Sequence, residues 1–495
     1  MDLLIGLDVG TTSTKALLFN PQGQVIASAS QPYGLIASEG DRVEQDPQAL
    51  WEAVLTTLRA LERQLGPTDR VMAICQSSQG GTTIPADDSG NPVFNAISWM
   101  DQRARSEGTQ AEERFGEEGF YRLTGWPFHA TLPFRHILWL RKHAPETFAR
   151  ARRFLFVNDF IGHRLTGEYC MNPSDASITH LFNIEQGDWD ERLLELAGIQ
   201  PQQLSPVKPS GVIVGTLTKH VSMETGLAPG IPLINGAHDQ YCAAVGLGVT
   251  SPGPMLLSCG TAWVLLAVPE TLQVGFQSRM AISCHAVLGR WGAMRALGGV
   301  GASLEWLIDQ VFTGLDKTVE RKQLYAAVNE SVLSSQPGAG GLLCYPLSGG
   351  HAELEFAGRG GFIGLSLKHT RADMARAVME GVVFDLRWTL EEIQAAGVCV
   401  NEMKMVGGAA GSPAWPQVVT DVTGIPVVLP DIREAASWGA AILAGVGAGI
   451  FPDATADVSR AGPQRRLEPN IGYRARYDEL FGHYKTLCPQ VCKTL

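Results

Sequence analysis

The sequence has no excess of positive charge, no paired cysteines and no long apolar run, and each absence excludes a class of protein. Lys and Arg total 39 against 50 Asp and Glu, which argues against nucleic acid or an anionic membrane as a partner. The nine cysteines lack the spacing of a metal site, which favours reduced thiols in a cytoplasmic protein over disulfides. The longest apolar stretch, 435–451, is rich in Gly and Ala and shorter than the ~20 residues of a membrane span, so it predicts a buried helix.

Two nucleotide-binding motifs are also missing. No GxxxxGK[ST] occurs, which excludes a P-loop. The glycine-rich segments 298–303 and 445–449 lack the full GxGxxG pattern of a dinucleotide fold. No basic residue precedes the first apolar run, so we expect a first strand there and not a secretory signal.

What the sequence does have is a hairpin pattern that occurs twice. Near the start, an apolar run leads into Asp8-Val9-Gly10-Thr11-Thr12-Ser13, and a second apolar run follows. A tight turn of Gly and hydroxyl residues between two strands can hold phosphate, while Asp8 can hold a divalent cation. An ordinary hairpin with a polar tip is the alternative. A weaker copy, Gly260-Thr261 between apolar runs, follows about 250 residues later. In a chain of 495 residues, this predicts a duplicated domain with a nucleotide between the halves.

The segment 231–246 contains the strongest catalytic candidate. Its pattern predicts a strand that runs into a Gly-containing turn, followed by a small-residue helix from Tyr241 to Gly246. Asp239 lies between them, where a carboxylate can face a cleft and take a proton from an alcohol acceptor. A helix-capping Asp is the alternative. The neighbouring His238 is expected to point elsewhere and is only a weak candidate.

Three other segments contain candidate site residues or predicted secondary structure. Trp99 and Asp101 follow a probable strand, where an indole can stack on a sugar and polar groups can bind hydroxyls, although a core position is the more common one for Trp. A predicted strand over 403–406 ends in the glycine turn 407–412, an arrangement that suits adenosine or phosphate. Asp373 is predicted to cap a long amphipathic helix.

With these motifs the chain resembles the FGGY family of carbohydrate kinases over roughly residues 3–450. One family signature is matched by 360–365, seven further residues and then 373–380. The other is matched over 133–143, except that His136 stands where the family carries Lys. The resemblance implies an α/β fold of two duplicated ribonuclease H-like (actin-type) domains with a nucleotide cleft between them. The implied domains are 1–247 with the sugar site and catalytic Asp, 248–450 for the nucleotide, and a C-terminal extension, 451–495, packing on the core.

The resemblance also implies roles for individual residues. Asp239 would be the catalytic base, and Asp8 and Asp239 would lie beside Mg²⁺. The residues implied in ATP binding are Gly10, Thr11, Thr12, Ser13, Lys15, Gly260, Thr261, Gly301, Gly408 and Ser412. Those implied in sugar binding are Gln79, Gly80, Gly81, Trp99, Asp101 and Asp239. At Gln79-Gly80-Gly81 the chain departs from the Met-His-Gly of xylulose kinases and the Arg-Glu of glycerol kinases, and the two glycines are expected to widen the pocket.

The activity implied is ATP-dependent phosphorylation of a terminal hydroxyl of a small sugar, with a ketopentose such as xylulose as the expected acceptor. Glycerol, another ketose, a polyol or an aldonate stay open as acceptors. An actin-like or chaperone-like ATPase is the alternative that is not a metabolic enzyme. A sugar-sensing repressor is disfavoured because no helix-turn-helix precedes the first hairpin. The expected partners are ATP and the sugar, with a homodimer left open and neither nucleic acid nor membrane expected.

Overall fold

The computed structural model describes most of the chain, namely residues 1–38, 41–129, 131–260, 262–272, 279–298, 300–313, 319–345, 360–432, 434–455 and 464–494. Contacts divide the chain into two compact units. Unit 1 consists of 1–251, 268–293 and 434–461, and unit 2 consists of 252–267, 294–433 and 462–495. The units are thus interleaved along the sequence, and the linear domain division expected above stays a prediction.

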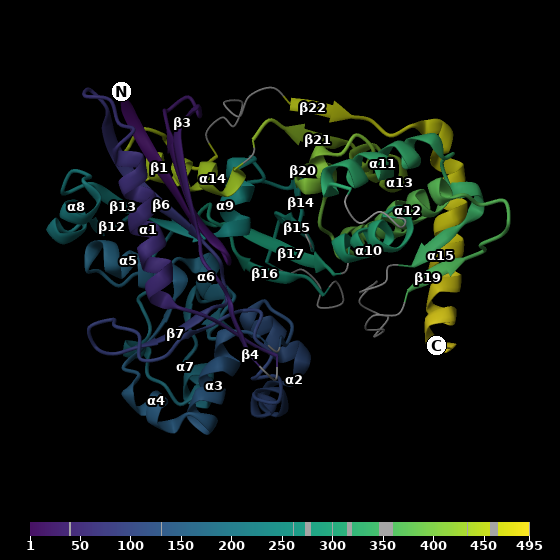
Figure 1. The fold of residues 1–495 in the computed structure, drawn as a ribbon. Coiled ribbons are helices and arrows are strands. Elements are labelled where there is room, and N and C mark those ends of the chain that lie inside the picture. Colours follow the sequence, from purple (N-terminus) through teal and green to yellow (C-terminus); the bar gives the residue numbers. More distant parts are fainter. Residues whose placement is uncertain are drawn as a thin grey trace. The chain divides into compact units, whose positions relative to one another are not determined.

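The central sheet of unit 1 brings three parallel strand ends to one edge. Its six strands run in the order β12-β13-β6-β1-β2-β3 (Figure 1). β1 is parallel to β6 and β6 is parallel to β13, while β2 is antiparallel to β1 and completes the predicted hairpin. Their bounds are β1 (Asp2–Val9), β2 (Ser13–Phe19), β3 (Val25–Pro32), β6 (Arg70–Ser78), β12 (Ile213–Thr216) and β13 (Pro232–His238). Asp8, Ser77 and His238 therefore lie at the same end of neighbouring strands.

The two faces of this sheet are covered by different helices. Alternate residues of β1, Leu3, Ile5 and Leu7, belong to the core that contains the apolar face of α1 (Pro47–Glu62). Gly6 faces the other way, where a Cβ would collide with the carbonyl of Ser437 in α14 (Ala435–Gly447). Because side chains alternate along a strand, Asp8 lies on the α14 face.

Two helices of unit 1 follow from their local sequence, and the buried helix predicted over 435–451 is confirmed. Asp46 Oδ1 accepts a hydrogen bond from Gln48 N at 2.9 Å, so Asp46 is the N-cap of α1, with Pro47 at its first position. The apolar stretch from residue 435 forms the buried helix α14.

The predicted turn in the catalytic segment is wrong. β13 continues through Gly236 to His238, and α9 (Asp239–Gly246) begins at Asp239 instead of Tyr241. Gly236 lies so close to the Gln76 carbonyl of β6 that no side chain would fit, which explains a glycine inside a strand.

Unit 1 also contains elements that lie outside its central sheet. One is a five-stranded sheet in the order β4-β5-β8-β7-β9, with β4 (Ile36–Ser38), β5 (Arg42–Gln45), β7 (Thr83–Ala86), β8 (Ala96–Ile97) and β9 (Arg153–Phe156). The remaining strands are β10 (Phe182–Asn183), β11 (Asp188–Trp189) and β16 (Ala281–Cys284). The remaining helices are α2 (Thr109–Thr124), α3 (Pro133–His143), α4 (Pro145–Arg150), α5 (Val157–Thr166), α6 (Pro173–Ser177), α7 (Glu191–Ala197) and α8 (Lys219–Thr225).

Unit 2 repeats the strand plan of unit 1. Its strands follow the order β17-β15-β14-β20-β21-β22, with β14 (Gly253–Cys259), β15 (Trp263–Ala267), β17 (Trp291–Leu297), β20 (Val400–Gly407), β21 (Val427–Pro430) and β22 (Gln464–Leu467). β14 is antiparallel to β15 and parallel to β20, and the outermost strand, β22, is antiparallel to β21. The same order and directions hold for β2, β1, β6, β13 and β12 in unit 1. The predicted duplication is therefore confirmed.

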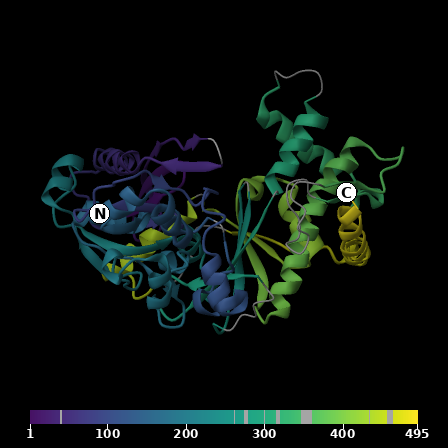
Figure 2. The same cartoon turned by 90° about the horizontal axis from the view of Figure 1, so that it is seen from below.

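The helices of unit 2 are α10 (Val300–Leu307), α11 (Arg321–Ser334), α12 (Arg371–Ala395), α13 (Trp415–Thr423) and α15 (Arg474–Thr494), with a small pair of strands, β18 (Leu343–Tyr345) and β19 (Gly361–Ile363). α15, the yellow helix of Figures 1 and 2, packs against α12 and α13. The predicted cap of α12 needs correction. Thr370 is the N-cap, and Asp373 is the third helical residue, whose carboxylate accepts from Thr370 N at 2.8 Å in a capping box.

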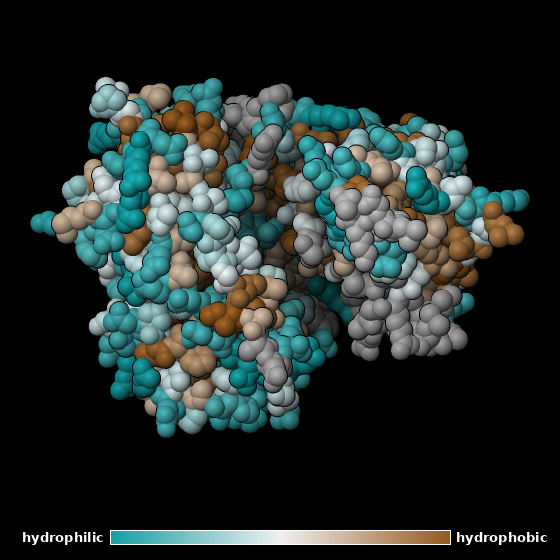
Figure 3. Space-filling model, in the orientation of Figure 1, coloured by the Kyte–Doolittle hydropathy of each residue, from teal (hydrophilic) through white to brown (hydrophobic). Residues whose placement is uncertain are grey.

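The surface and the cysteines agree with the composition. In the view of Figure 3, hydrophilic side chains cover most of the described surface, with small scattered apolar patches. No helix among the described residues has the length and apolarity that a membrane span requires. Eight cysteines have described side chains, and none of the eight is in a disulfide.

Candidate active site

Asp8 is the centre of a polar cluster at the strand ends of unit 1. It lies opposite Lys15 in the antiparallel register and opposite Ser77 in the parallel register, so all three share the α14 face. Ser77 Oγ donates to Asp8 Oδ1 at 2.8 Å. Burial and the nearby Asp239 carboxylate raise the pKa of Asp8 to about 7, against the smaller opposing effects of Ser77 and Lys15. A cation beside Asp8 would stabilise the ionised form of this buried carboxylate.

The turn from Gly10 to Ser13 is held by donors that bind its carbonyls. The Tyr33 hydroxyl donates to Gly10 O at 2.5 Å, and Gln45 Nε2 donates to Thr11 O at 2.8 Å. Tyr33 N donates to Thr12 O at 3.0 Å. Within the described residues, no acceptor is recorded for the N–H groups of Thr11 and Thr12. A turn whose carbonyls are fixed and whose N–H groups are available is suited to bind an anion.

Asp239 occupies the first position of α9 without capping it. No side chain caps α9, so the alternative of a helix-capping Asp is not supported. The Asp239 side chain is 31% exposed, yet its Oδ1 is buried and has no hydrogen-bond partner.

His238 does not point away from Asp239, contrary to expectation. Its Nε2 lies 3.4 Å from Asp239 Oδ1. The alternation rule fails here because His238 ends the strand and Asp239 starts the helix, so the two residues do not follow one strand geometry. A buried carboxylate, Asp175 of α6, lies close enough to His238 for their charges to interact.

A third carboxylate completes the cluster. Asp175 Oδ2 accepts from Asn172 Nδ2 at 2.7 Å and from Ser78 Oγ at 3.2 Å. Burial raises the pKa of Asp175 to about 6, although the His238 charge and these hydrogen bonds oppose the shift. The sequence pattern did not indicate Asp175, since only the fold brings α6 to the end of β6.

The donor set fits a divalent cation held together with a substrate. Mg²⁺ is usually bound by one or two carboxylates plus waters and substrate phosphates. Asp8 and Asp239 supply two carboxylates, and Asp239 Oδ1 accepts no hydrogen bond. Among the described residues, no group of three or more His, Cys, Asp or Glu side chains could hold a metal by itself.

Gly80 and Gly81 do not widen a pocket, which corrects the expectation. Gly81 has φ +74°, and a Cβ on it would lie 3.1 Å from Trp99 Cβ and 3.3 Å from Leu132 Cδ2. The space beside Gly80 is filled by His238 and Ile178. Glycine is therefore favoured at position 81 by the positive φ of its backbone, and at position 80 by the lack of room for a side chain.

Gln79 is buried and forms part of the support for the anion-binding turn. Its Nε2 donates to Gln45 Oε1 at 3.1 Å, and Gln45 in turn donates to Thr11 O. Gln79 N donates to Val9 O at 2.9 Å. The side chain thus connects the end of β6 to the turn after β1.

Trp99 is not a core residue. It is 43% exposed, and its Nε1 donates to Thr11 Oγ1 at 3.1 Å. The general preference of Trp for the interior does not hold here, because Trp99 lies in a short loop after β8 and contacts the turn after β1. An exposed indole beside the turn fits the predicted sugar-stacking role, which stays a prediction.

Asp101 is completely buried and its oxygens are occupied. Oδ2 accepts from Val43 N at 2.6 Å, and Arg103 binds both oxygens at 2.7 and 2.8 Å. Arg103 also pairs with Glu44 at 2.6 Å. This geometry favours a role in fixing the Trp99 loop over direct sugar binding.

The predicted nucleotide residues of unit 2 follow the second copy of the motif. Gly260 follows β14 directly and Gly408 follows β20, while Gly301 lies in the first turn of α10. Ser412 Oγ accepts from Ala414 N and Trp415 N at 3.1 Å each, so this hydroxyl fixes the start of α13. Thr261 lies outside the described residues.

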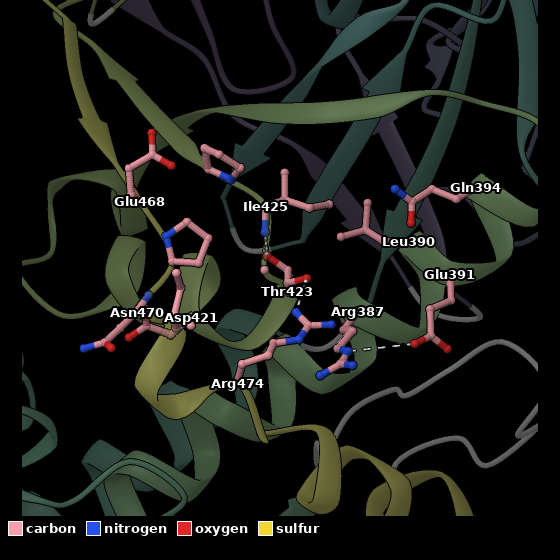
Figure 4. Close-up of a pocket in the computed structure, with 14 residues that line it drawn as sticks. Arg387, Leu390, Glu391, Gln394, Asp421, Thr423, Ile425, Glu468, Asn470 and Arg474 are labelled. Atoms are coloured by element: carbon pink, nitrogen blue, oxygen red, sulfur yellow. Dashed lines mark hydrogen bonds and ion pairs between the residues drawn. The ribbon is translucent and has the colours of Figure 1, made fainter. Parts of the chain in front are cut away.

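A cavity of about 720 Å³ in unit 2 is separate from all the predicted site residues of that unit (Figure 4). It lies at the C-terminal end of α13, where Arg387 donates to Val422 O and Arg474 donates to Thr423 O, each at 3.2 Å. These arginines satisfy carbonyls that the helix end leaves free. Glu391 and Glu468 also line the cavity, so it does not present a simple anion site.

Comparison with known proteins gives consistent matches over the whole chain. The model for the N-terminal domain of the FGGY family of carbohydrate kinases matches residues 3–246, and that for the C-terminal domain matches 255–448. A xylulose kinase of Staphylococcus epidermidis is 30% identical over 500 residues, covering 99% of this chain and 97% of the relative. A gluconokinase of Bacillus subtilis is 29% identical over 446 residues, covering 89% and 86%. The solved xylulose kinase from Rhodospirillum rubrum has a TM-score of 0.91 at 27% identity, covering 98% of each chain.

Proposed function

The chain belongs to the FGGY family of carbohydrate kinases, and we propose that its acceptor is a ketopentose such as xylulose, phosphorylated on a terminal hydroxyl. Membership of the family makes it an ATP-dependent sugar kinase, in preference to an actin-like or chaperone-like ATPase. The similarity to a xylulose kinase over nearly the whole chain supports the pentulose. The similarity to a gluconokinase keeps an aldonate as the second candidate.

The Asp239 carboxylate carries the mechanistic proposal. It is partly exposed, its Oδ1 accepts no hydrogen bond, and it lies where β1, β6 and β13 end. As general base it accepts the proton of the sugar hydroxyl while that oxygen attacks the γ-phosphorus. The bond from the γ-phosphorus to the bridging oxygen breaks, and ADP leaves with the electron pair.

Two residues help to offset the negative charge of the ATP phosphates, Asp8 by holding the metal ion and Lys15 by its own positive charge. A magnesium ion, held by Asp8 and Asp239 together with ATP, would offset the charge of the phosphate oxygens. The N–H groups of Thr11 and Thr12, with the neighbouring hydroxyls, donate to phosphate oxygens. Lys15 adds a positive charge opposite Asp8 in the hairpin register. The free thiols and acidic composition support a cytoplasmic enzyme that acts on small molecules.

The base assignment is tested with Asp239→Asn, which keeps the shape of the side chain and removes its capacity to take a proton. We expect sugar-dependent ADP release to fall by at least about a thousandfold, while ADP binding measured by calorimetry changes less than threefold. Asp88→Asn, in an exposed turn, is the matched control and should keep full turnover. Undiminished turnover in Asp239→Asn would remove Asp239 from the mechanism.

The acceptor is tested separately with a coupled ADP-release screen of the wild-type protein across ketopentoses, other ketoses, polyols and aldonates. We expect the highest kcat/KM with a ketopentose. Strong turnover with gluconate or glycerol alone would overturn the pentulose assignment and leave the base assignment intact.

A further inference from the structure

Four side chains form a row across the central sheet of unit 1, on the face covered by α14. Asp8 of β1 lies opposite Lys15 of β2 on one side and opposite Ser77 of β6 on the other. Ser77 in turn lies opposite Ala237 of β13. Residues paired in register point to the same face of a sheet, so these four side chains are neighbours. Within the row, Lys15 and Ser77 are the two residues with a polar group that could bind the Asp8 carboxylate.

Of these two residues, Ser77 is the one that binds Asp8. The Lys15 Nζ lies 2.8 and 2.9 Å from the carboxylate oxygens of Glu434, and no bond from Lys15 to Asp8 is recorded among the described residues. Ser77 Oγ donates to Asp8 Oδ1 at 2.8 Å, and within the described part of the chain this is the one recorded hydrogen bond to the Asp8 side chain. The orientation of this carboxylate therefore depends on Ser77.

Among the described neighbours of the Ser77 hydroxyl, Asp8 is the strongest acceptor. The thiol of Cys242 in α9 lies beside this hydroxyl, and burial raises the pKa of the thiol well above its usual value. The thiol donates its proton to Ala237 O, 3.4 Å from Cys242 Sγ. Because a protonated thiol is a weak acceptor, the single proton of Ser77 Oγ is directed at the carboxylate.

Burial prevents water from replacing this hydroxyl. Ser77 is completely buried, on a strand that contacts both α9 and α14. α14 comes so close to the sheet that a Cβ at Gly6, two residues before Asp8, would collide with the Ser437 carbonyl. Without Ser77 Oγ, Asp8 Oδ1 would lose its donor, and the carboxylate could rotate about the bond that joins it to Cβ.

We propose that Ser77 is a positioning residue, which fixes Oδ1 of Asp8 and thereby leaves Oδ2 for the metal ion that accompanies ATP. The inference rests on the proposed function, since it takes Asp8 as a ligand of that ion. Mg²⁺ requires a near-ideal octahedral geometry, so a carboxylate that is held in place binds it better than one that rotates. Replacement of a residue that hydrogen-bonds to a metal ligand typically lowers metal affinity or activity by about 10–100-fold.

The two carboxylates of the site thus differ in their support. Asp8 is held by a buried donor, whereas Asp239 Oδ1 accepts no hydrogen bond. A carboxylate in a fixed orientation suits a metal ligand, and one with an unoccupied oxygen suits a base that takes a proton. The hydrogen bonding therefore agrees with the different roles proposed for Asp8 and Asp239.

The proposal is tested by calorimetric binding of the imido analogue of ATP, with and without Mg²⁺. The ratio of the two dissociation constants gives the gain in affinity that the metal ion provides, and its measurement needs neither sugar nor turnover. We expect Ser77→Ala to reduce this gain by about 10-fold or more, while the affinity without Mg²⁺ stays within about threefold of the wild type. The half-saturating Mg²⁺ concentration for sugar phosphorylation should rise by a similar factor.

Two further variants separate positioning from a loss of structure. Ser205→Ala is the matched control, because Ser205 is also completely buried and donates to a buried carboxylate, Asp159 Oδ2, at 2.6 Å. It should leave the Mg²⁺ gain within about twofold of the wild type, whatever its melting temperature. Ser77→Thr keeps the hydroxyl and should recover at least part of the gain that Ser77→Ala loses. Melting temperatures are measured for all variants, and if Ser77→Thr does not fold, the comparison of Ser77→Ala with Ser205→Ala decides.

The proposal is overturned if the wild type gains no affinity from Mg²⁺, or if folded Ser77→Ala keeps a gain within twofold of the wild type. It is equally overturned if Ser205→Ala loses as much of the gain as Ser77→Ala, or if folded Ser77→Thr is as impaired as Ser77→Ala. None of these outcomes depends on which sugar is the acceptor or on whether Asp239→Asn is inactive. Failure of this inference and failure of the proposed function are therefore separate results.

Discussion

Lys15 Nζ lies 2.9 and 2.8 Å from the two carboxylate oxygens of Glu434, a residue 419 positions further along the chain. Glu434 directly precedes α14, so this ion pair attaches the first hairpin to the start of the helix that covers its sheet. Both charges also act on Asp8, since Lys15 lowers and Glu434 raises the pKa of that carboxyl. The pair thus positions the cation that is predicted to meet the phosphates of ATP.

Loss of the ion pair should weaken ATP binding, and replacement of Lys15 should weaken it more than replacement of Glu434. Lys15→Met removes a charge predicted to contact phosphate, and we expect KM for ATP to rise about 10-fold or more. Glu434→Gln leaves Lys15 charged but less fixed, so KM for ATP should rise by a smaller factor. Both side chains are more than a third exposed, so the screened attraction between them contributes little to stability itself. Steady-state kinetics at varied ATP measures both effects.

Lys142→Met is the control for this pair, because Lys142 is also half of a partly exposed ion pair, with Glu107. Its KM for ATP should stay within about twofold of the wild type. Glu434→Gln should add little when Lys15 is already Met, because its main expected effect on ATP binding is through that lysine. An unchanged KM for ATP in Lys15→Met contradicts the phosphate role.

The hydrogen bond between Trp99 and Thr11 connects the predicted sugar wall to the anion-binding turn. Trp99→Phe keeps an aromatic face but loses the Nε1 donor, so KM for the sugar should rise a few-fold, whereas Trp99→Ala should raise it about 10-fold or more. Thr11→Val removes the acceptor, and Trp99→Phe should then have no further effect. Trp306→Phe, at a similarly exposed Trp of α10, is the control. A Trp99→Ala protein with unchanged sugar KM would exclude the stacking role.

Motifs with short-range causes could be predicted from the sequence. The hairpin around Gly10, the capped start of α1 and the glycine turn after β20 each depend on residues that are neighbours in the chain. The family signature ending at Glu380 was also recognisable, although its carboxylate is a buried structural group that binds Arg376 and Tyr477. A recognisable motif therefore did not have to be part of the catalytic site.

Contacts between distant segments could not be predicted in the same way. Lys15 forms an ion pair with a residue 419 positions away, and the absence of a side chain at Gly80 is explained by the imidazole of His238 in β13. In each case the sequence shows the residue type but not its partner, because strand order and register decide which side chains meet. The expectation of a wider pocket failed for this reason: the volume that a glycine leaves can be taken by a residue far along the chain.

The crossing of α9 and α14 should be intolerant of any side chain at Gly439. A Cβ there would collide with the Cys242 carbonyl of α9 and would lie 2.9 Å from Gly246 N. Gly439→Ala should therefore lower stability by about 1–3 kcal/mol, seen as a melting temperature several degrees lower. Because α9 begins with Asp239, sugar turnover should fall as well.

Gly482→Ala is the control for that variant. Gly482 is an exposed residue of α15 with nothing within 4 Å of a Cβ, so alanine should raise stability by about 0.5–1 kcal/mol. Equal melting temperatures for Gly439→Ala and Gly482→Ala would contradict the close helix crossing.

Asp159 should make the stability of the protein decrease as the pH rises from about 4 to 7. Burial raises the pKa of this carboxyl to about 7, although Ser205 Oγ and Phe156 N donate to it at 2.6 Å each. Between the usual value of 3.8 and 7, the folded protein keeps a proton that the unfolded chain has lost, so raising the pH favours unfolding. Asp159→Asn removes this titration while still accepting from Phe156 N, so the variant should gain stability relative to the wild type over that range.

Asp87→Asn should behave oppositely, since hydrogen bonds from Asn91 lower the pKa of Asp87. Denaturant unfolding at several pH values measures both, and parallel curves for wild type and Asp159→Asn would show that Asp159 does not titrate in this way.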